Sequence, residues 1–146
     1  MMPKTKRISK FWFWFLSYTW GIIMSAIGSI VVLALLLTGH KPIRNHYSWR
    51  FEIGKGWGGM ELGPFSIMNI NASQSLQDHE FGHALQNCYL GPLMIFISLA
   101  SAMRYWYREY LNRVKGIAYR DMVDYDNAWY EGTASYLGEY FRNCEE

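Results

Sequence analysis

His79-Glu80-Phe81-Gly82-His83 is the stretch of this 146-residue chain from which the rest can be interpreted. The surrounding sequence is typical of a helix, and residues four apart lie on one helix face, so His79 and His83 can direct their imidazoles at one point. Two imidazoles with an adjacent carboxylate are typical of a catalytic zinc site, with Glu80 as the general base. The alternative is a structural helix on which both histidines are solvated and no metal binds.

The ends of this helix are marked by turn and capping residues. It is expected to begin near Ser73 or Ser75, because Ser75 is followed three residues later by Asp78 in a pattern that resembles a capping box. It is expected to end at Gly91-Pro92, since proline cannot continue the hydrogen-bond ladder. Gly82, inside the helix, would allow another group to approach closely, which suits a position beside a metal.

A third ligand is needed, because a catalytic zinc ion usually has three protein ligands. Glu131 is the preferred candidate. It lies in a predicted helix over residues 127–141, capped by Asp124 or Asp126, and its face continues with small residues that allow close approach to another helix. The small residues of that face are Ala134, Ser135 and Gly138. The alternative ligands are Asp126, Asp124 and, last, Glu139.

The combination of His79-Glu80-x-x-His83 with Glu131-x-x-Ala134 resembles the gluzincin group of zinc metallopeptidases. The stretch G-G-M-E-L-G-P-F over 58–65, followed by H-E-F-G-H-A-L-Q over 79–86, is similar to small bacterial membrane proteins of that type. The resemblance covers roughly residues 57–140.

This resemblance implies Zn²⁺ as the cofactor, His79, His83 and Glu131 as its ligands, and Glu80 as the general base. Many gluzincins have an acid four residues after the ligand glutamate, which orients a zinc histidine. This chain has Ser135 at that position. Support for the histidine is therefore expected to come from elsewhere.

Residues 11–39 contain no charged side chain and are long enough to cross a bilayer, which needs roughly 20 apolar residues. They are predicted to form one retained transmembrane helix. A cleavable signal peptide is the alternative, but the apolar run is too long and no typical cleavage site follows it. Cations flank both ends, so the orientation is almost undetermined, with a slight preference for a cytoplasmic N-terminus.

Charge and composition exclude some function classes. The formal net charge is +2, and four cations lie in the tail over residues 1–10, so no basic face for nucleic acid remains. Hydrophobic residues make up 51% of the chain and aromatic residues 18%, an excess that requires an apolar partner. Cys88 and Cys144 lack a C-x-x-C spacing and are interpreted as structural or free thiols.

Two further segments complete the predicted domain. Residues 47–53 alternate in polarity, and 60–62 and 65–70 follow as short strands, which predicts a small antiparallel sheet whose edge can pair with an extended substrate. The apolar helix at 92–114 is predicted to dip into the membrane, lie along it or pack inside the domain. A full crossing would place Glu131 and the histidines on opposite sides of the bilayer.

The sequence thus predicts an α+β fold with a basic tail (1–10), a transmembrane helix (11–39) and a minimal zincin-like domain (40–146) that includes the membrane-associated helix at 92–114. The expected function is that of a zinc metallopeptidase in the bacterial cell membrane, with a membrane-proximal peptide or protein substrate. A non-catalytic metal-binding membrane protein or interaction partner is the alternative. Candidate donors to the reacting oxygen are Tyr125, Tyr130, Tyr136 and His46.

Overall fold

The computed structural model describes residues 8–144, and the fold is α+β, as the sequence predicts. The helices are α1 (Lys10–Ser17), α2 (Ile22–Leu37), α3 (Gln74–Leu90), α4 (Met94–Arg113) and α5 (Trp129–Asn143). The strands are β1 (Ile43–Asn45), β2 (Ser48–Glu52), β3 (Gly59–Leu62) and β4 (Phe65–Met68). Short 3₁₀ turns are η1 (Gly91–Leu93), η2 (Tyr119–Asp121) and η3 (Tyr125–Asn127). Residues 1–7, most of the predicted basic tail, lie outside the described residues.

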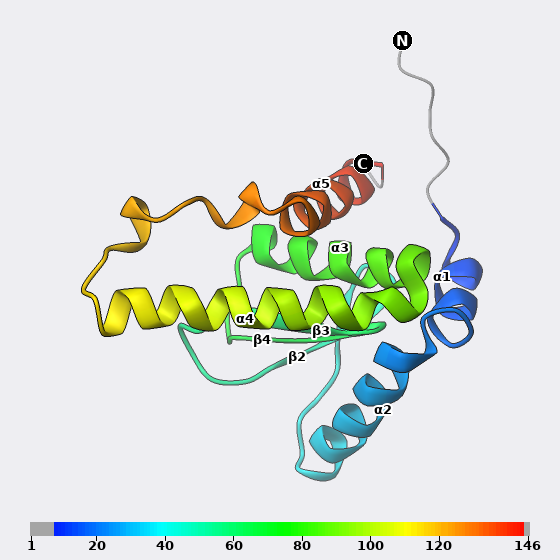
Figure 1. Ribbon diagram of the computed structural model, residues 1–146. Coiled ribbons are helices and arrows are strands. Elements are labelled where there is room, and N and C mark those ends of the chain that lie inside the picture. The colour runs from blue at the N-terminus through cyan, green and yellow to red at the C-terminus, as the bar shows by residue number, and fades with distance from the viewer. Residues whose placement is uncertain (1–7, 145–146) are drawn as a thin grey trace.

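Helix α3 is the central layer of the fold. It lies between α5 on one side and the sheet on the other, and α4 runs back along it (Figure 1). Its buried face includes Phe81, Ala84, Leu85 and Cys88, which pack with Phe13 and Phe141 in the main hydrophobic cluster. The H-E-x-x-H segment is therefore a core element, not a solvated surface helix.

Two glycines bring α3 and α5 into backbone contact. A Cβ atom at Gly82 would lie 1.8 Å from the carbonyl oxygen of Ala134, and one at Gly138 would lie 1.8 Å from that of Asp78. The group that approaches Gly82 is thus the α5 backbone. Ala134 and Gly138 belong to the predicted small-residue face, whose packing role is confirmed.

Replacing Gly138 by Ala should destabilise the protein. Alanine is the better helix former by about 1 kcal/mol, but the methyl group would collide with a backbone oxygen that cannot move aside. We expect a loss of about 3 kcal/mol in the free energy of unfolding, measured by denaturation in detergent. The exposed Glu139→Ala on the same helix is the control; a stabilised Gly138→Ala variant would contradict this packing.

The predicted ends of α3 hold, with one correction. Ser73 is the N-cap, and its side chain accepts a hydrogen bond from the backbone N–H of Leu76. The capping pattern at Ser75 is therefore not used. Gly91 ends the helix with a φ of +57°, as its position before proline predicts. Helix α5 begins at Trp129 without a side-chain cap, and Asp124 caps the turn η3 instead.

The sheet is mixed, which corrects the predicted antiparallel sheet. Its order is β1-β2-β4-β3; β2 and β4 are parallel and the other neighbours antiparallel. The reason is the connection after β2, which passes to β3 at the edge before the Gly63-Pro64 turn returns the chain as β4 beside β2. Alternation along a strand does not encode the direction of its partner.

The prediction of one continuous helix over residues 11–39 is wrong. Helices α1 and α2 meet at an angle of 91° across a short break. The break has a structural cause: Gly21 packs so closely on Asn87 of α3 that a Cβ atom would lie 2.5 Å from its side-chain nitrogen. Ser25 and Gly28 also face the domain, with Gly28 against the Leu62 backbone.

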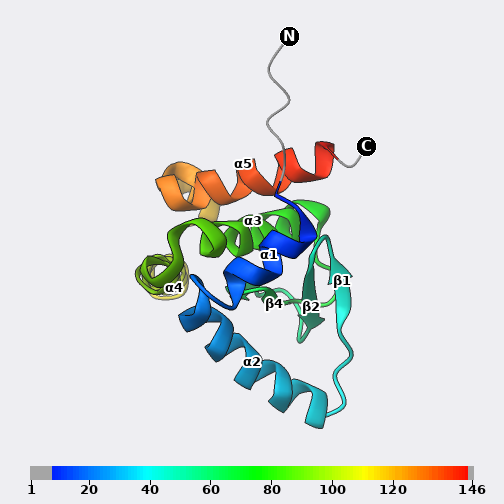
Figure 2. The same cartoon turned by 90° about the vertical axis from the view of Figure 1, so that its right-hand side faces the viewer.

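By length and composition, one helical segment among residues 8–144 could cross a membrane, Gln74–Arg113, which joins α3, η1 and α4. The bent pair of α1 and α2 passes the same test only when the two helices are taken together. Figure 2 shows α4 and α2 on the side of α3 remote from α5.

Candidate metal centre

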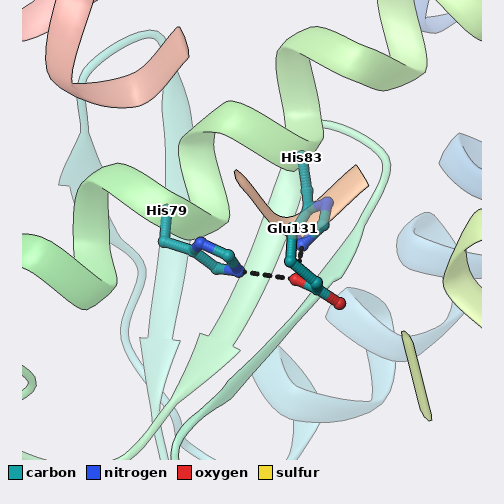
Figure 3. Close-up of side chains that lie close together, drawn as sticks. All are labelled: His79, His83 and Glu131. Carbon is teal, nitrogen blue, oxygen red and sulfur yellow. Dashed lines mark hydrogen bonds and ion pairs between the residues drawn. The ribbon is translucent and has the colours of Figure 1, made fainter. Parts of the chain in front are cut away.

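Three side chains from two helices converge at the interface of α3 and α5. The Oε2 atom of Glu131 lies 3.0 Å from Nε2 of His79 and 3.1 Å from Nε2 of His83 (Figure 3). Glu131 is fully buried, and the glycine contacts between the two helices let its short side chain reach both imidazoles. The structure therefore brings together the three residues that the sequence analysis selected as ligands.

The spacing of these atoms suits a metal ion. One ligand atom from each of His79, His83 and Glu131 lies within 4.8 Å of the others, the one such group among the described residues. Two atoms about 2.0–2.1 Å from a tetrahedral zinc ion lie about 3.3 Å apart, close to the observed separations. The group can hold a metal ion.

The outer nitrogen of His83 is fixed by a chain of hydrogen bonds. Gln86 donates its Nε2–H to the carbonyl oxygen of Tyr130 at 2.8 Å, and a carbonyl can only accept. The amide oxygen of Gln86 must then face Nδ1 of His83, 2.8 Å away, so Nδ1 carries a proton. This leaves Nε2 of His83 as the nitrogen directed at Glu131, where a metal ion can bind.

The outer nitrogen of His79 is held by Ser135. Its Nδ1 lies 2.8 Å from the hydroxyl oxygen of Ser135, which projects from α5 one turn after Glu131. From the sequence, support for the histidine was expected to come from elsewhere, because gluzincins usually have an acid at this position. That expectation is wrong: the serine itself orients the ring.

Replacing Ser135 by Ala should weaken metal binding without unfolding the protein. The imidazole of His79 would lose the partner of its Nδ1, and losses of this kind typically cost about 10–100-fold in metal affinity. Competition with a zinc-binding dye measures the change. Thr133→Ala is the matched control, since its exposed hydroxyl bonds only to its own helix backbone. Equal affinities for both variants would exclude the proposed role.

Glu131 is held as a carboxylate. Burial alone raises its pKa, but hydrogen bonds with His79 and His83 outweigh burial and hold the pKa of Glu131 well below its usual range. Its second oxygen accepts a hydrogen bond from the hydroxyl of Ser101 on α4. Burial lowers the pKa of His83, yet the hydrogen bond with Glu131 and nearby carboxylates raise it to about 9.

Glu80 points a free oxygen into the same region. It is buried, and its Oε2 has no hydrogen-bond partner among the described residues. Burial raises the pKa of Glu80, and the neighbouring His83 and His79 partly offset that effect. A Cβ atom on Gly59 would lie 3.1 Å from the other oxygen of Glu80, so the backbone of β3 passes directly over the carboxylate.

A cavity of about 550 Å³ opens beside these groups. Its walls include the two histidines, Glu80, strand β3 and one face of α4. Glu61 of β3 also lines it, with a buried Oε1 that has no hydrogen-bond partner among the described residues. Burial raises the pKa of Glu61 well above its usual range. Glu61 was not among the residues predicted from the sequence, where its only signal is an acid within an apolar strand.

The four candidate donors to the reacting oxygen differ in their position relative to the cavity. Of the four candidate donors, only Tyr125 lines the cavity, with its hydroxyl 3.5 Å from that of Ser101. Burial raises the pKa of Tyr125, so it stays a donor. His46 instead pairs with Asp78 at 3.0 Å, and Tyr130 and Tyr136 lie outside the cavity.

The alternative acids do not join the candidate ligand group. Asp126 lines the cavity, but Asp124, Asp126 and Glu139 are exposed and none belongs to the cluster of ligand atoms.

Comparison of the chain with protein-family models, with curated proteins and with solved structures finds no match.

Proposed function

We propose that the protein is a membrane-anchored zinc metallopeptidase of the gluzincin type. The observation that carries this proposal is the convergence of His79, His83 and Glu131 beside the free carboxylate oxygen of Glu80. A ligand set alone would suit a structural site. A buried carboxylate with an unpartnered oxygen, on a residue that lines the adjoining cavity, is what a hydrolase needs in addition.

The donor set favours zinc. Two imidazoles and one carboxylate are the ligands of many catalytic zinc sites, in which the fourth position is left open for water or substrate. Calcium and magnesium prefer oxygen ligands, and only one of these three residues offers oxygen. The buried Glu131 supplies a negative charge that offsets part of the charge of a divalent cation.

Each residue has a role in hydrolysis of an amide. A zinc ion held by the three ligands would acidify a water molecule and polarise the scissile carbonyl group. Glu80 would take the proton of the attacking water through Oε2 and pass it to the leaving nitrogen. Tyr125 would donate a hydrogen bond to the developing oxyanion.

Strand β3 offers a place for the substrate backbone. It is the edge strand of the sheet, and it passes over Glu80 at Gly59. An extended peptide that pairs with this edge would lie across the metal centre. We propose a peptide or protein near the membrane as the substrate.

The bent pair of α1 and α2 is proposed as the anchor in a bacterial cell membrane. Helix α2 has 16 residues and a rise of about 1.5 Å per residue, so alone it is shorter than the roughly 30 Å of a bilayer core. With α1 it forms a broken apolar segment, whose outward side chains are aliphatic or aromatic. The lipid bilayer is the apolar partner that the composition requires.

Removal of the metal should abolish activity. The full-length protein, reconstituted in vesicles with zinc, is expected to cleave members of a peptide library. Treatment with 1,10-phenanthroline should stop cleavage, and added zinc should restore it. Cleavage that persists in the chelator would exclude a metallopeptidase. Tight zinc binding without any cleavage would favour the non-catalytic metal-binding alternative.

A further inference from the structure

Three chain segments line the cavity along its length: α3, the segment that contains β3, and α4. Helix α3 contributes Ser75 before His79 and His83, and the segment from Trp57 through β3 to Leu62 also lines the cavity. Helix α4 runs in the opposite direction (Figure 1). Its register is fixed at two points: Tyr105 donates a hydrogen bond to the carbonyl oxygen of Trp57 at 2.9 Å, and Ser101 contacts Glu131 at the metal centre.

The cavity consequently has two different ends, with the metal centre between them. The end nearer α2 is mostly apolar: it is formed by Met24 of α2, Leu62 of β3 and Met94 of α4, with Ser98 of α4 and the buried Glu61 of β3 beside them. It lies where α2 packs on β3, since a Cβ atom on Gly28 would fall 2.1 Å from the Leu62 carbonyl oxygen. Methionines are flexible and adapt to apolar groups of different shape.

The opposite end is polar. It is formed by Ser73 and Ser75 at the start of α3 and by Asp126 of η3, all of them exposed. A second, smaller pocket adjoins this end and is lined by Ser75, Asp126 and further charged side chains. A bound chain would therefore pass from apolar surroundings, across the metal centre, into water.

The outer surface of α4 changes in the same direction. Phe96, Leu99 and Met103 are exposed on its first half, at the level of the apolar end and the metal centre. Trp106, which is 68% exposed, follows beside the polar end. The helix finishes at Arg113, whose side chain is 79% exposed. Purely hydrocarbon-like side chains, then tryptophan, then a cation are the order met on passing from the bilayer core through the interface to the headgroups.

Helix α2 also has an outer face that suits lipid. Its face towards the domain is made of Met24, Ser25 and Gly28, whereas its outward side chains are entirely apolar. Exposed examples are Ile23, Ile27, Ile30 and Leu33. The apolar end of the cavity thus lies between two helices whose outer faces both suit lipid.

We propose that the cavity binds a peptide that is inserted in the bilayer and cleaves it where it leaves the membrane. This proposal rests on the peptidase function and names the substrate class: an apolar segment on one side of the scissile bond and a polar segment on the other. The apolar segment lies at the α2–α4 end of the cavity, and the polar segment leaves past Ser75 and Asp126.

Cysteine labelling tests the placement independently of activity. Single cysteines replace Ser98 at the apolar end or Ser75 at the polar end, in full-length protein with Cys144→Ser; Cys88 is buried and serves as the internal blank. The protein is reconstituted in vesicles of phosphatidylcholine and phosphatidylglycerol. Each variant is treated with a membrane-partitioning alkyl maleimide and with a charged, water-soluble methanethiosulfonate.

We expect Ser98→Cys to react about tenfold or more faster with the alkyl maleimide than with the charged reagent, because a charge enters the bilayer at high cost. Ser75→Cys should show the opposite preference. A Ser98→Cys variant that prefers the charged reagent, or that reacts with neither, would overturn the proposal. Zinc content, measured on each variant, separates this result from failure of the metal site.

A matched pair of peptides tests the substrate class. One peptide has a leucine/alanine block long enough to insert in the vesicle, followed by a polar segment; the other is the polar segment alone. We expect zinc-dependent cleavage within a few residues of the boundary in the first peptide only. Equal cleavage of both would overturn the substrate class. Cleavage of neither, with the labelling pattern as expected, would refute the peptidase function itself.

Discussion

Glu80→Gln should lose about 10²–10⁴-fold in the rate of peptide hydrolysis while it retains its zinc. The substitution keeps the size of the side chain but removes the proton acceptor. Because Glu80 does not belong to the group of ligand atoms, metal binding should be unchanged. Initial rates on a cleaved library peptide, together with the zinc content of the same preparation, measure both quantities.

The control for this variant is Glu139→Gln. Glu139 is exposed on α5 and lies outside the cavity beside the metal centre, so its replacement should leave the rate and the zinc content unchanged. A Glu80→Gln variant with full activity would refute the assignment of the general base. A variant that loses zinc as well would instead make Glu80 part of the metal site.

Glu131→Gln should lose most of its zinc affinity and, with it, the activity. The amide has no negative charge, and it would be buried between two imidazoles that face it at 3.0 and 3.1 Å. We expect an affinity at least about 100-fold below that of the unaltered protein, because loss of a ligand should exceed the loss of an outer hydrogen bond.

The fold of Glu131→Gln must be checked separately, since Glu131 is fully buried and also accepts a hydrogen bond from Ser101. Circular dichroism of the variant in detergent should match that of the unaltered protein. The Ser101→Ala variant lacks the same hydrogen bond but keeps the Glu131 carboxylate, so it should retain zinc. Zinc binding by Glu131→Gln equal to that of Ser101→Ala would exclude Glu131 as a ligand.

The candidate metal-binding group was predictable because its members lie in local patterns. The two histidines are one helical turn apart, and Glu131 is followed by the small residues that let α5 approach α3. The role of Ser135 was not predictable in the same way. Its hydroxyl replaces the acid expected from the family pattern, and only the helix crossing places it 2.8 Å from His79.

Other features depend on contacts between distant segments. Glu61 and Ser101 reach the site from β3 and α4, and neither lies in a motif that marks chemistry. The bend between α1 and α2 arises from the contact of Gly21 with Asn87, a residue 66 positions later. The parallel pairing of β2 with β4 likewise reflects chain path, which a short alternating strand does not record.

His79, His83 and Glu131 are proposed to bind one zinc ion. Elemental analysis of the full-length protein, purified without chelator in zinc-supplemented medium, tests this proposal most directly. We expect about one zinc ion per chain in the unaltered protein and in Glu80→Gln, and almost none in His83→Ala or Glu131→Gln. An unaltered protein without bound metal, or equal zinc in all four proteins, would contradict the assignment of these three ligands.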